Sequence, residues 1–195
     1  MKQTDMGQDT KKILAYIAGV ALGDGNLSNP NGRATRLRIT CDKKYKNIIK
    51  RICAAIQKLL PNNKVSLIKC KSNCINISCY SNQWEDLLGW KALGGSKYKQ
   101  KVSIPDWIIK NRNFSIACLR GLLETDGSIY KDRGYQMVNF VTIIPKLATN
   151  VMEIIADLGF KPRMYKILTI NKTRYNIRIS QNTTEFIKLI NFIKD

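Results

Sequence analysis

The clearest hydrophobic pattern lies near the N-terminus, where a stretch from about Thr10 to Gly23 is apolar on nearly every side. A helix that is apolar all round is buried on both sides. Gly19 and Gly23 are four positions apart and therefore share one face of this helix. Glycine weakens a helix by about 1 kcal/mol, so this spacing predicts close packing against a second helix.

The same pattern returns about a hundred residues later, which is the period of an internal repeat. The segment from Ile17 to Gly25 (IAGVALGDG) has its counterpart from Leu119 to Gly127 (LRGLLETDG). Gly121 and Thr125 stand where the first copy has its two helical glycines. The two helices are therefore predicted to pack on each other across a pseudo-twofold axis.

Each repeated helix is followed by the same order of alternating and periodic segments. In the first half, alternating residues 26–28 follow the helix directly, and the patterns then predict strands at residues 35–41, 64–69 and 74–80, a helix at 45–60 and a short helix from 83. In the second half, alternating residues 128–130 follow the helix, and the patterns then predict strands at 135–142, 162–168 and 174–180, a helix at 145–158, and a last helix capped by Thr183 or Thr184. Both halves have the order α-β-β-α-β-β-α, which predicts a duplicated α+β fold.

The boundaries follow from this order. Residues 8–90 form the predicted N-terminal half-domain and residues 114–195 the C-terminal one. Between them, residues 91–113 contain Gly94-Gly95 and a basic run from Lys97 to Lys101 and are interpreted as a linker.

The net charge of the chain indicates the kind of partner that it binds. The chain has 33 Lys and Arg against 14 Asp and Glu, a net charge of +19. Such a basic chain favours a polyanionic partner, and nucleic acid is the default because Lys and Arg displace counterions from phosphates. Charge does not distinguish DNA from RNA, and the other interpretation is a solvated basic surface.

Several classes of site are excluded by residue types. The chain has no histidine, which removes histidine-metal nucleases, histidine general bases and zinc deaminases. Its six cysteines include no C-x-x-C pair and are interpreted as reduced thiols. No apolar run is long enough to span a membrane and no signal pattern begins the chain, so we expect an intracellular protein.

The candidate chemistry lies at the end of each repeated helix. Asp24 and Asp126 each precede a glycine there. If the helices pack together, the two carboxylates meet and repel unless cations bridge them. Hard Mg²⁺ suits oxygen ligands, and a bound metal activates water against a phosphodiester without histidine. One Asp-Gly is an ordinary turn, but two in matching frames predict a pair of active-site carboxylates.

At these residues the chain resembles the single-chain, two-motif LAGLIDADG homing endonucleases. The resemblance covers nearly the whole chain and includes residues 104–108 before the second motif. It implies two saddle-shaped antiparallel sheets over the DNA major groove, with the motif helices at the interface. It also implies a monomer that cleaves both strands across the minor groove, leaves 3′ overhangs and recognises double-stranded DNA of about 20 base pairs.

The family likeness also implies site residues. The last acidic residue of each motif is catalytic, here Asp24 and Asp126, and the carbonyl oxygens of Gly23 and Thr125 assist in binding Mg²⁺, for which Mn²⁺ or Ca²⁺ can substitute in binding. Family members often carry an assisting Lys or Gln near the second strand.

Two features leave alternatives open. The sixth motif position is Leu22 in the first copy and Glu124 in the second; Glu124 is either a spare metal ligand or, as favoured here, a helix-end residue. For the assisting residue, Lys43 and Lys146 are the candidates, with ordinary phosphate contact as the other interpretation.

Period-two alternation predicts which strand residues read DNA. It is clearest where Tyr175, Ile177 and Ile179 point inward and Arg, Asn and Ser residues point outward, because Arg and Asn bind guanine and adenine edges. An antiparallel sheet can also simply present a polar face to water. The predicted DNA-contacting set is Asn26, Ser28, Arg36, Arg38, Thr40, Asn76, Ser78, Tyr80, Ser128, Tyr130, Arg174, Asn176, Arg178 and Ser180.

Two other functions remain open on the same fold. One is a maturase that binds intron RNA, and the other is a DNA-binding protein that has lost cleavage. Retention of both Asp24 and Asp126 favours the site-specific DNA endonuclease.

Overall fold

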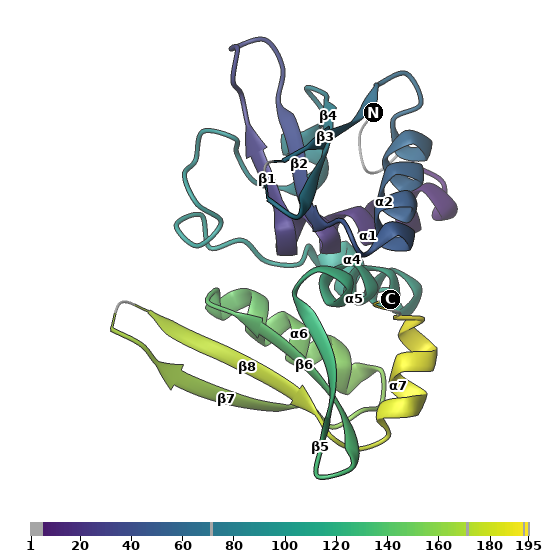
Figure 1. Ribbon diagram of the computed structural model, residues 1–195, viewed down its shortest axis with the longest axis vertical. Coiled ribbons are helices and arrows are strands. Elements are labelled where there is room, and N and C mark those ends of the chain that lie inside the picture. Colours follow the sequence, from purple (N-terminus) through teal and green to yellow (C-terminus); the bar gives the residue numbers. More distant parts are fainter. Residues whose placement is uncertain (1–5, 71, 171, 193, 195) are drawn as a thin grey trace.

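The computed structural model describes residues 6–70, 72–170, 172–192 and 194. Two halves with the same order of elements lie one above the other, with the chain crossing between them near α4 and α5 (Figure 1). The first half contains α1 (Gln8–Asp24), β1 (Gly25–Ser28), β2 (Arg36–Asp42), α2 (Lys46–Leu59), β3 (Val65–Lys69), β4 (Cys74–Tyr80) and α3 (Trp84–Leu88). The second contains α5 (Arg112–Asp126), β5 (Gly127–Asp132), β6 (Tyr135–Thr142), α6 (Pro145–Asp157), β7 (Arg163–Leu168), β8 (Thr173–Ile179) and α7 (Thr183–Ile190), and α4 (Asp106–Ile109) lies between the halves.

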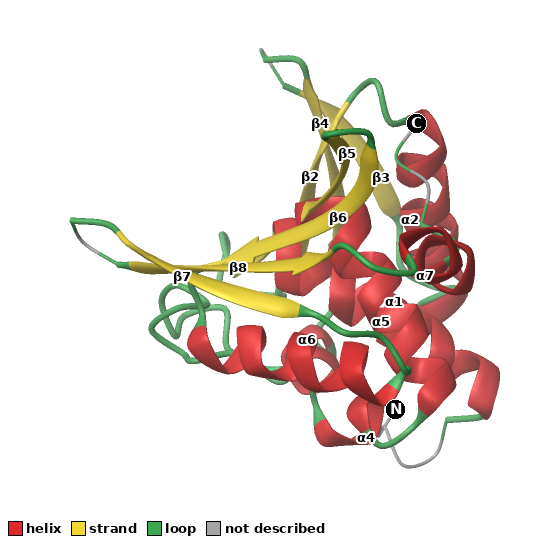
Figure 2. Ribbon diagram, turned by 90° about the horizontal axis from the view of Figure 1, so that it is seen from below, coloured by secondary structure: helices red, strands yellow, loops and turns green. Residues whose placement is uncertain are grey.

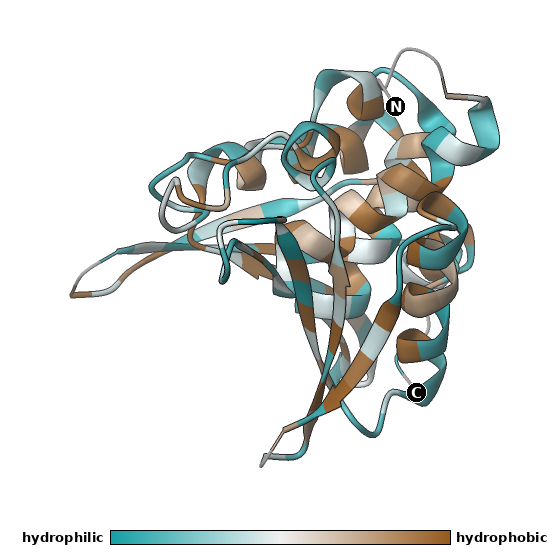
Figure 3. Ribbon diagram, turned by 90° about the horizontal axis from the view of Figure 1, so that it is seen from above, coloured by the Kyte–Doolittle hydropathy of each residue, from teal (hydrophilic) through white to brown (hydrophobic). Residues whose placement is uncertain are grey.

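Each half contains one four-stranded antiparallel sheet. The strand orders are β1-β2-β4-β3 and β5-β6-β8-β7, so the two sheets have the same topology. The helices labelled in Figure 2 lie on one side of the two sheets, and among the described residues no helix covers the other face. Hydrophilic and hydrophobic residues alternate along the strands (Figure 3), so each sheet has one face against the helical core and one outward face. The predicted duplicated α+β fold is confirmed.

The core is continuous across both halves, with α1 and α5 at its centre. The α1 residues from Leu14 to Leu22 are all buried, as their apolar pattern predicts. Helix α5 begins after Asn111, whose side chain accepts hydrogen bonds from the backbone N–H groups of Asn113 and Phe114 at 3.0 and 3.2 Å. Inward Ile177 and Ile179 are also buried, whereas Tyr175 is half-buried.

One local expectation differs from the structure. The residue that precedes α7 is Asn182, in the left-handed region and without a side-chain cap, rather than Thr183 or Thr184. Thr183 is already the first residue of α7, and its hydroxyl donates to the carbonyl of Gln136 at 3.0 Å. None of the helices in the described ranges has the length and apolarity needed to cross a bilayer.

Candidate active site and nucleic-acid interface

The repeated helices approach each other closely at their glycines. A Cβ added to Gly19 would lie 2.0 Å from the carbonyl oxygen of Cys118, and one added to Gly121 would lie 2.3 Å from that of Tyr16. At Gly23, an added Cβ would lie 2.0 Å from Thr125 Oγ1. These positions admit no side chain, which confirms the predicted packing of α1 on α5.

This packing brings the C-terminal ends of the two helices together. Asp24 is the last residue of α1 and Asp126 the last of α5. Asp126 Oδ2 lies 3.2 Å from the point that a Cβ on Gly23 would occupy. The two carboxylates, one from each half, therefore belong to one site.

The electrostatics of this site disfavour two ionised carboxylates. Although both side chains reach solvent, the surrounding protein raises the pKa of Asp24 by desolvation. Desolvation and the neighbouring Asp24 charge raise the pKa of Asp126 to about 6. Lys97 and Lys194 oppose both shifts, so positive charge stabilises the pair.

Two lysines that sequence reasoning missed lie at this site. Lys97 Nζ donates to the carbonyl oxygens of Ala21 at 3.1 Å, of Leu22 at 2.6 Å and of Gly23. Lys194 Nζ donates to those of Thr125 at 2.9 Å and of Gly127 at 2.7 Å.

The two lysines occupy corresponding places. Each follows the last helix of its half and places an ammonium at the C-terminal end of a motif helix, where the helix dipole favours positive charge. Burial lowers the pKa of both lysines, while the aspartates oppose that shift. The duplication therefore extends to a pair of ammonium groups.

Each carboxylate also borders its own cavity. The cavity beside Asp126 has a volume of about 360 Å³, and the one beside Asp24 about 200 Å³. Lys97 lines the first cavity and Lys194 the second, so each lysine binds the carbonyls of one motif helix and faces the aspartate of the other. Each cavity thus places a motif aspartate beside an ammonium; the first cavity also contains Lys172, and the second also contains Asp42 and Glu124.

The lysines proposed from sequence as assisting residues lie elsewhere. Lys43 Nζ donates to the carbonyl of Ser72 at 3.1 Å, at the β3–β4 hairpin. Lys146 lines a separate cavity with Tyr98, Lys99 and Lys101. Their assisting role stays a prediction, but the ammonium groups next to the aspartates are those of Lys97 and Lys194.

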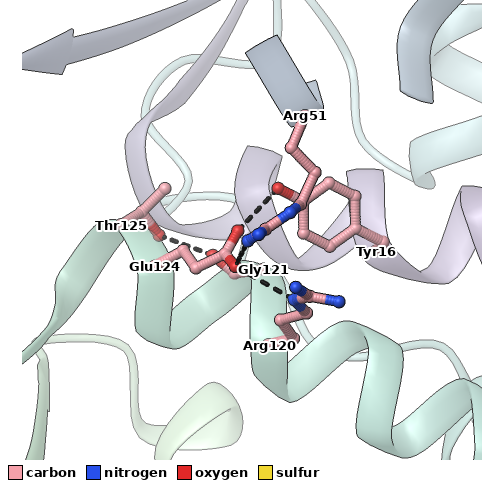
Figure 4. Close-up of polar contacts among 6 residues, drawn as sticks. All are labelled: Tyr16, Arg51, Arg120, Gly121, Glu124 and Thr125. Atoms are coloured by element: carbon pink, nitrogen blue, oxygen red, sulfur yellow. Dashed lines mark hydrogen bonds and ion pairs between the residues drawn. The ribbon is translucent and has the colours of Figure 1, made fainter. Parts of the chain in front are cut away.

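Glu124 lies in the last turn of α5, as the favoured helix-end interpretation expects, and its carboxylate also belongs to a buried network. Its side chain has no exposed surface. It accepts hydrogen bonds from Tyr16 Oη at 2.6 Å, from Arg120 Nε at 3.0 Å and from Arg51. These groups come from α1, α5 and α2, so the network joins the two halves (Figure 4). Burial and the adjacent Glu124 raise the pKa of Tyr16, which keeps it a donor.

The network gives a stability prediction. Glu124→Gln removes the charge from a buried acceptor of two arginines, and we expect the free energy of unfolding to fall by about 1 to 2 kcal/mol. Urea denaturation measures this, with Glu153→Gln on the exposed surface of α6 as the matched control. Metal-dependent cleavage should survive in the folded variant. A loss of metal binding without a loss of stability would identify Glu124 as a ligand instead.

The predicted DNA-contacting residues gather on the uncovered faces of the two sheets. In the first sheet, strand pairing aligns Asn26, Arg38 and Ser78 in one row, aligns Ser28, Arg36 and Tyr80 in the next, and pairs Thr40 with Asn76. In the second sheet, strand pairing places Ser128 and Arg178 on either side of Asn139. Nearby rows contain Tyr130, Asn176 and Arg174. Ser180 follows the end of β8. Corresponding rows therefore run beside each aspartate.

Contacts within these faces refine the prediction. Ser78 lies in a row between Arg38 and Ser66 and is only 2% exposed, so it is less accessible than alternation predicts. Arg178 forms an ion pair with Asp132 and lies over the Tyr130 ring. Asn139 was missed, although the alternation around inward Val138 and Phe140 signals it.

Several polar atoms of these faces have no hydrogen-bond partner among the described residues. They are Arg38 Nε, Ser78 Oγ, Asn139 Oδ1, Asn176 Oδ1 and Arg178 Nε. Buried polar groups normally have partners, so this concentration on the uncovered faces is unusual. It marks the faces as surfaces suited to a polar ligand.

Comparison with known proteins agrees with the duplicated architecture. Residues 13–88 match the model of the WhiA LAGLIDADG-like domain, and residues 113–191 match that of the LAGLIDADG-like domain. The ATP-dependent DNA helicase Hel308 of Thermococcus kodakarensis is 24% identical over 85% of this chain. The chain spans 15% of the length of that relative.

Solved structures share the fold at low sequence identity. The homing endonuclease I-DmoI matches with a TM-score of 0.70 and 19% identity, over 94% of this chain and 97% of that one. Full-length DUF199/WhiA from Thermatoga maritima matches with a TM-score of 0.66 and 13% identity, over 97% of this chain and 58% of that one. Each half therefore contains a stretch that matches a LAGLIDADG-like domain model, and the chain shares the fold of I-DmoI.

Proposed function

We propose that this chain is a site-specific, divalent-metal-dependent DNA endonuclease that hydrolyses both strands of its target. One observation carries the proposal: two carboxylates, one from each half, meet at the ends of the packed helices between two uncovered polar sheet faces. The net charge of +19 suits a phosphate backbone. As a monomer, the chain supplies both halves of the site itself.

The residues fit a divalent cation. Asp24 and Asp126 would hold Mg²⁺, with the carbonyl oxygens of Gly23 and Thr125 as further hard donors. Within the described ranges, no cluster of three or more acidic or thiol side chains is suited to a metal, so substrate and water oxygens would complete the coordination. When bound, Mg²⁺ supplies Lewis acidity and an activated water. Structures of I-DmoI in complex with DNA and Ca or Mn support this class of ion.

Lys97 and Lys194 are proposed to act on the phosphates. Each ammonium is fixed by carbonyl oxygens and faces a cavity beside an aspartate. Held there, it would orient a scissile phosphate and stabilise the negative charge that develops on its oxygens. Because a carbonyl oxygen has two lone pairs, the same carbonyls can accept from lysine and face a cation.

The lysines give a prediction. Lys97→Met or Lys194→Met removes an ammonium from one cavity while keeping a long side chain, and we expect the single-turnover cleavage rate to fall about 10²-fold. Lys99→Met, on the exposed surface of the same segment, is the matched control. Equal rates for Lys97→Met and Lys99→Met would remove Lys97 from the mechanism.

The raised pKa of Asp126 predicts a pH dependence. Because this pKa is about 6, protons compete with the metal below that pH, and the cleavage rate should rise as pH increases through about 6. More Mg²⁺ should shift the midpoint to lower pH. Single-turnover rates at several Mg²⁺ concentrations measure both effects. A midpoint independent of Mg²⁺ would show that another group titrates.

A second candidate function is DNA binding without cleavage. It is favoured by the two lysines, because their ammonium groups already balance the two carboxylates without a metal. RNA binding as a maturase is a variant of this candidate. Both would retain nucleic-acid binding and lack Mg²⁺-dependent strand breaks.

Selection of cleaved sites from a randomised duplex library in Mg²⁺, followed by sequencing of the ends, tests the proposal. We expect one recurrent site of about 20 base pairs with short 3′ overhangs. Enrichment of bound but uncleaved duplexes would support the second candidate instead.

A further inference from the structure

Two cysteines face each other across the β3–β4 hairpin. Strand pairing aligns Lys69 with Ile75, so Cys70 and Cys74 form the next pair, and Cys70 N donates to Cys74 O at 3.3 Å. Opposite residues of antiparallel strands have Cα atoms about 4.5 to 5.5 Å apart. Disulfides bridge Cα distances of about 4.4 to 6.8 Å, so a bond here requires little backbone movement.

Polar groups around this pair activate one of its thiols. Ser72 Oγ lies 3.0 Å from Cys74 Sγ. Hydrogen bonds from Ser72 and Cys70 lower the pKa of Cys74, and the Lys43 charge adds to this effect. The same contact raises the pKa of Cys70, so Cys74 ionises first.

The other four cysteines differ from Cys74 in the direction of their pKa shift. Cys41, Cys79 and Cys118 are buried, whereas Cys53 is half-buried, as Cys70 and Cys74 are. Burial raises the pKa of each of them, to about 12 for Cys41 and Cys118 and about 11 for Cys79. Reactivity requires the thiolate and access to solvent, so the chain contains its own inert controls.

We propose that Cys70 and Cys74 form an oxidisable dithiol whose reagent is hydrogen peroxide or another hydroperoxide. The Cys74 thiolate attacks the peroxide, the O–O bond breaks, and Cys74 becomes a sulfenic acid while hydroxide leaves and takes up a proton to form water. The Cys70 thiolate then attacks the Cys74 sulfur, the S–O bond breaks, and the hydroxide that leaves takes up the proton lost by Cys70 to form water, which completes the disulfide. In total, two thiols and one peroxide give one disulfide and two waters.

The dithiol lies on the uncovered face of the first sheet. Cys74 is in β4, the strand that carries Asn76 and Ser78. It pairs with Asp42 at the end of β2. The Ser72 and Asn73 carbonyls of this hairpin accept hydrogen bonds from Lys43. A disulfide would withdraw Cys74 Sγ from Ser72 and change this contact with Lys43. This consequence rests on the proposed function, and we expect target affinity to fall about fivefold on oxidation and to recover with dithiothreitol.

The test treats the full chain with hydrogen peroxide and reads intact mass, disulfide-linked peptides and DNA affinity. We expect a loss of about 2 Da and a Cys70–Cys74 linkage. Cys70→Ser should yield a sulfenic acid that dimedone traps on Cys74, Cys74→Ser should form no disulfide, and Cys53→Ser should behave as the unaltered chain does. A disulfide that persists in Cys74→Ser, or linkage through other cysteines, would overturn the dithiol.

The mass readout needs no DNA, so it stands if the proposed function fails. If the Cys70–Cys74 disulfide forms and the affinity for a DNA target that the chain cleaves does not change, the proposed effect of oxidation on DNA binding is overturned. The role of the Lys43 contact with the hairpin is tested separately with Lys43→Met. This variant should bind DNA more weakly in the reduced state, and oxidation should then lower its DNA affinity little further.

Discussion

Asp24→Asn and Asp126→Asn should each lower double-strand cleavage by at least about 10³-fold while leaving DNA affinity nearly unchanged. Asparagine keeps the shape of the side chain but loses the charge that a divalent cation needs. Because the two carboxylates come from different halves and border separate cavities, residual cleavage should nick one strand. A supercoiled plasmid carrying the selected target separates nicked from linear product.

Asp157→Asn, at the exposed end of α6, is the matched control and should cleave normally. Strand-labelled duplexes then show which strand each variant still cuts. If each half cuts one DNA strand, the two variants should retain cleavage of opposite strands. If both variants still cut the same DNA strand, the two carboxylates do not act on separate strands and work only as a unit.

Gly19→Ala should destabilise the fold by about 3 kcal/mol and also impair cleavage. The added methyl would lie 2.0 Å from a backbone oxygen of α5, so the two helices must separate. Alanine stabilises a helix by about 1 kcal/mol relative to glycine. The steric cost of the added methyl group must exceed this gain for the variant to be destabilised. Gly121→Ala meets a backbone oxygen at 2.3 Å and should behave similarly.

Gly7→Ala is the control for the glycine series. Gly7 lies just before α1 in an extended conformation with no atom near an added Cβ. The free energy of unfolding of Gly7→Ala, measured by urea denaturation, should therefore be close to that of the unaltered chain. Equal stabilities for Gly19→Ala and Gly7→Ala would contradict the packing of α1 on α5 as the basis of the site.

The fold was largely predictable because its signals are local. Apolar periodicity and the repeated segment predicted the central helices, and alternation predicted which sheet residues face outward. The helix α4 lay within the segment interpreted as a linker, since a helix of four residues carries little periodic signal.

The groups around the aspartates were less predictable because they come from irregular segments and distant positions. Lys97 and Lys194 follow the last helix of each half, where no periodic pattern indicates direction. The partners of Glu124 include Tyr16 and Arg51, which lie 108 and 73 residues away in the chain. Only the packing of the helices brings these side chains to one place.

The central claim is that the paired carboxylates make this chain a nuclease. It is tested most directly by incubating the unaltered chain and the double variant Asp24→Asn, Asp126→Asn in parallel with the randomised duplex library and Mg²⁺. We predict recurrent double-strand ends from the unaltered chain alone, with the same duplexes still bound by the double variant. The same ends produced at the same rate by the double variant would contradict the claim.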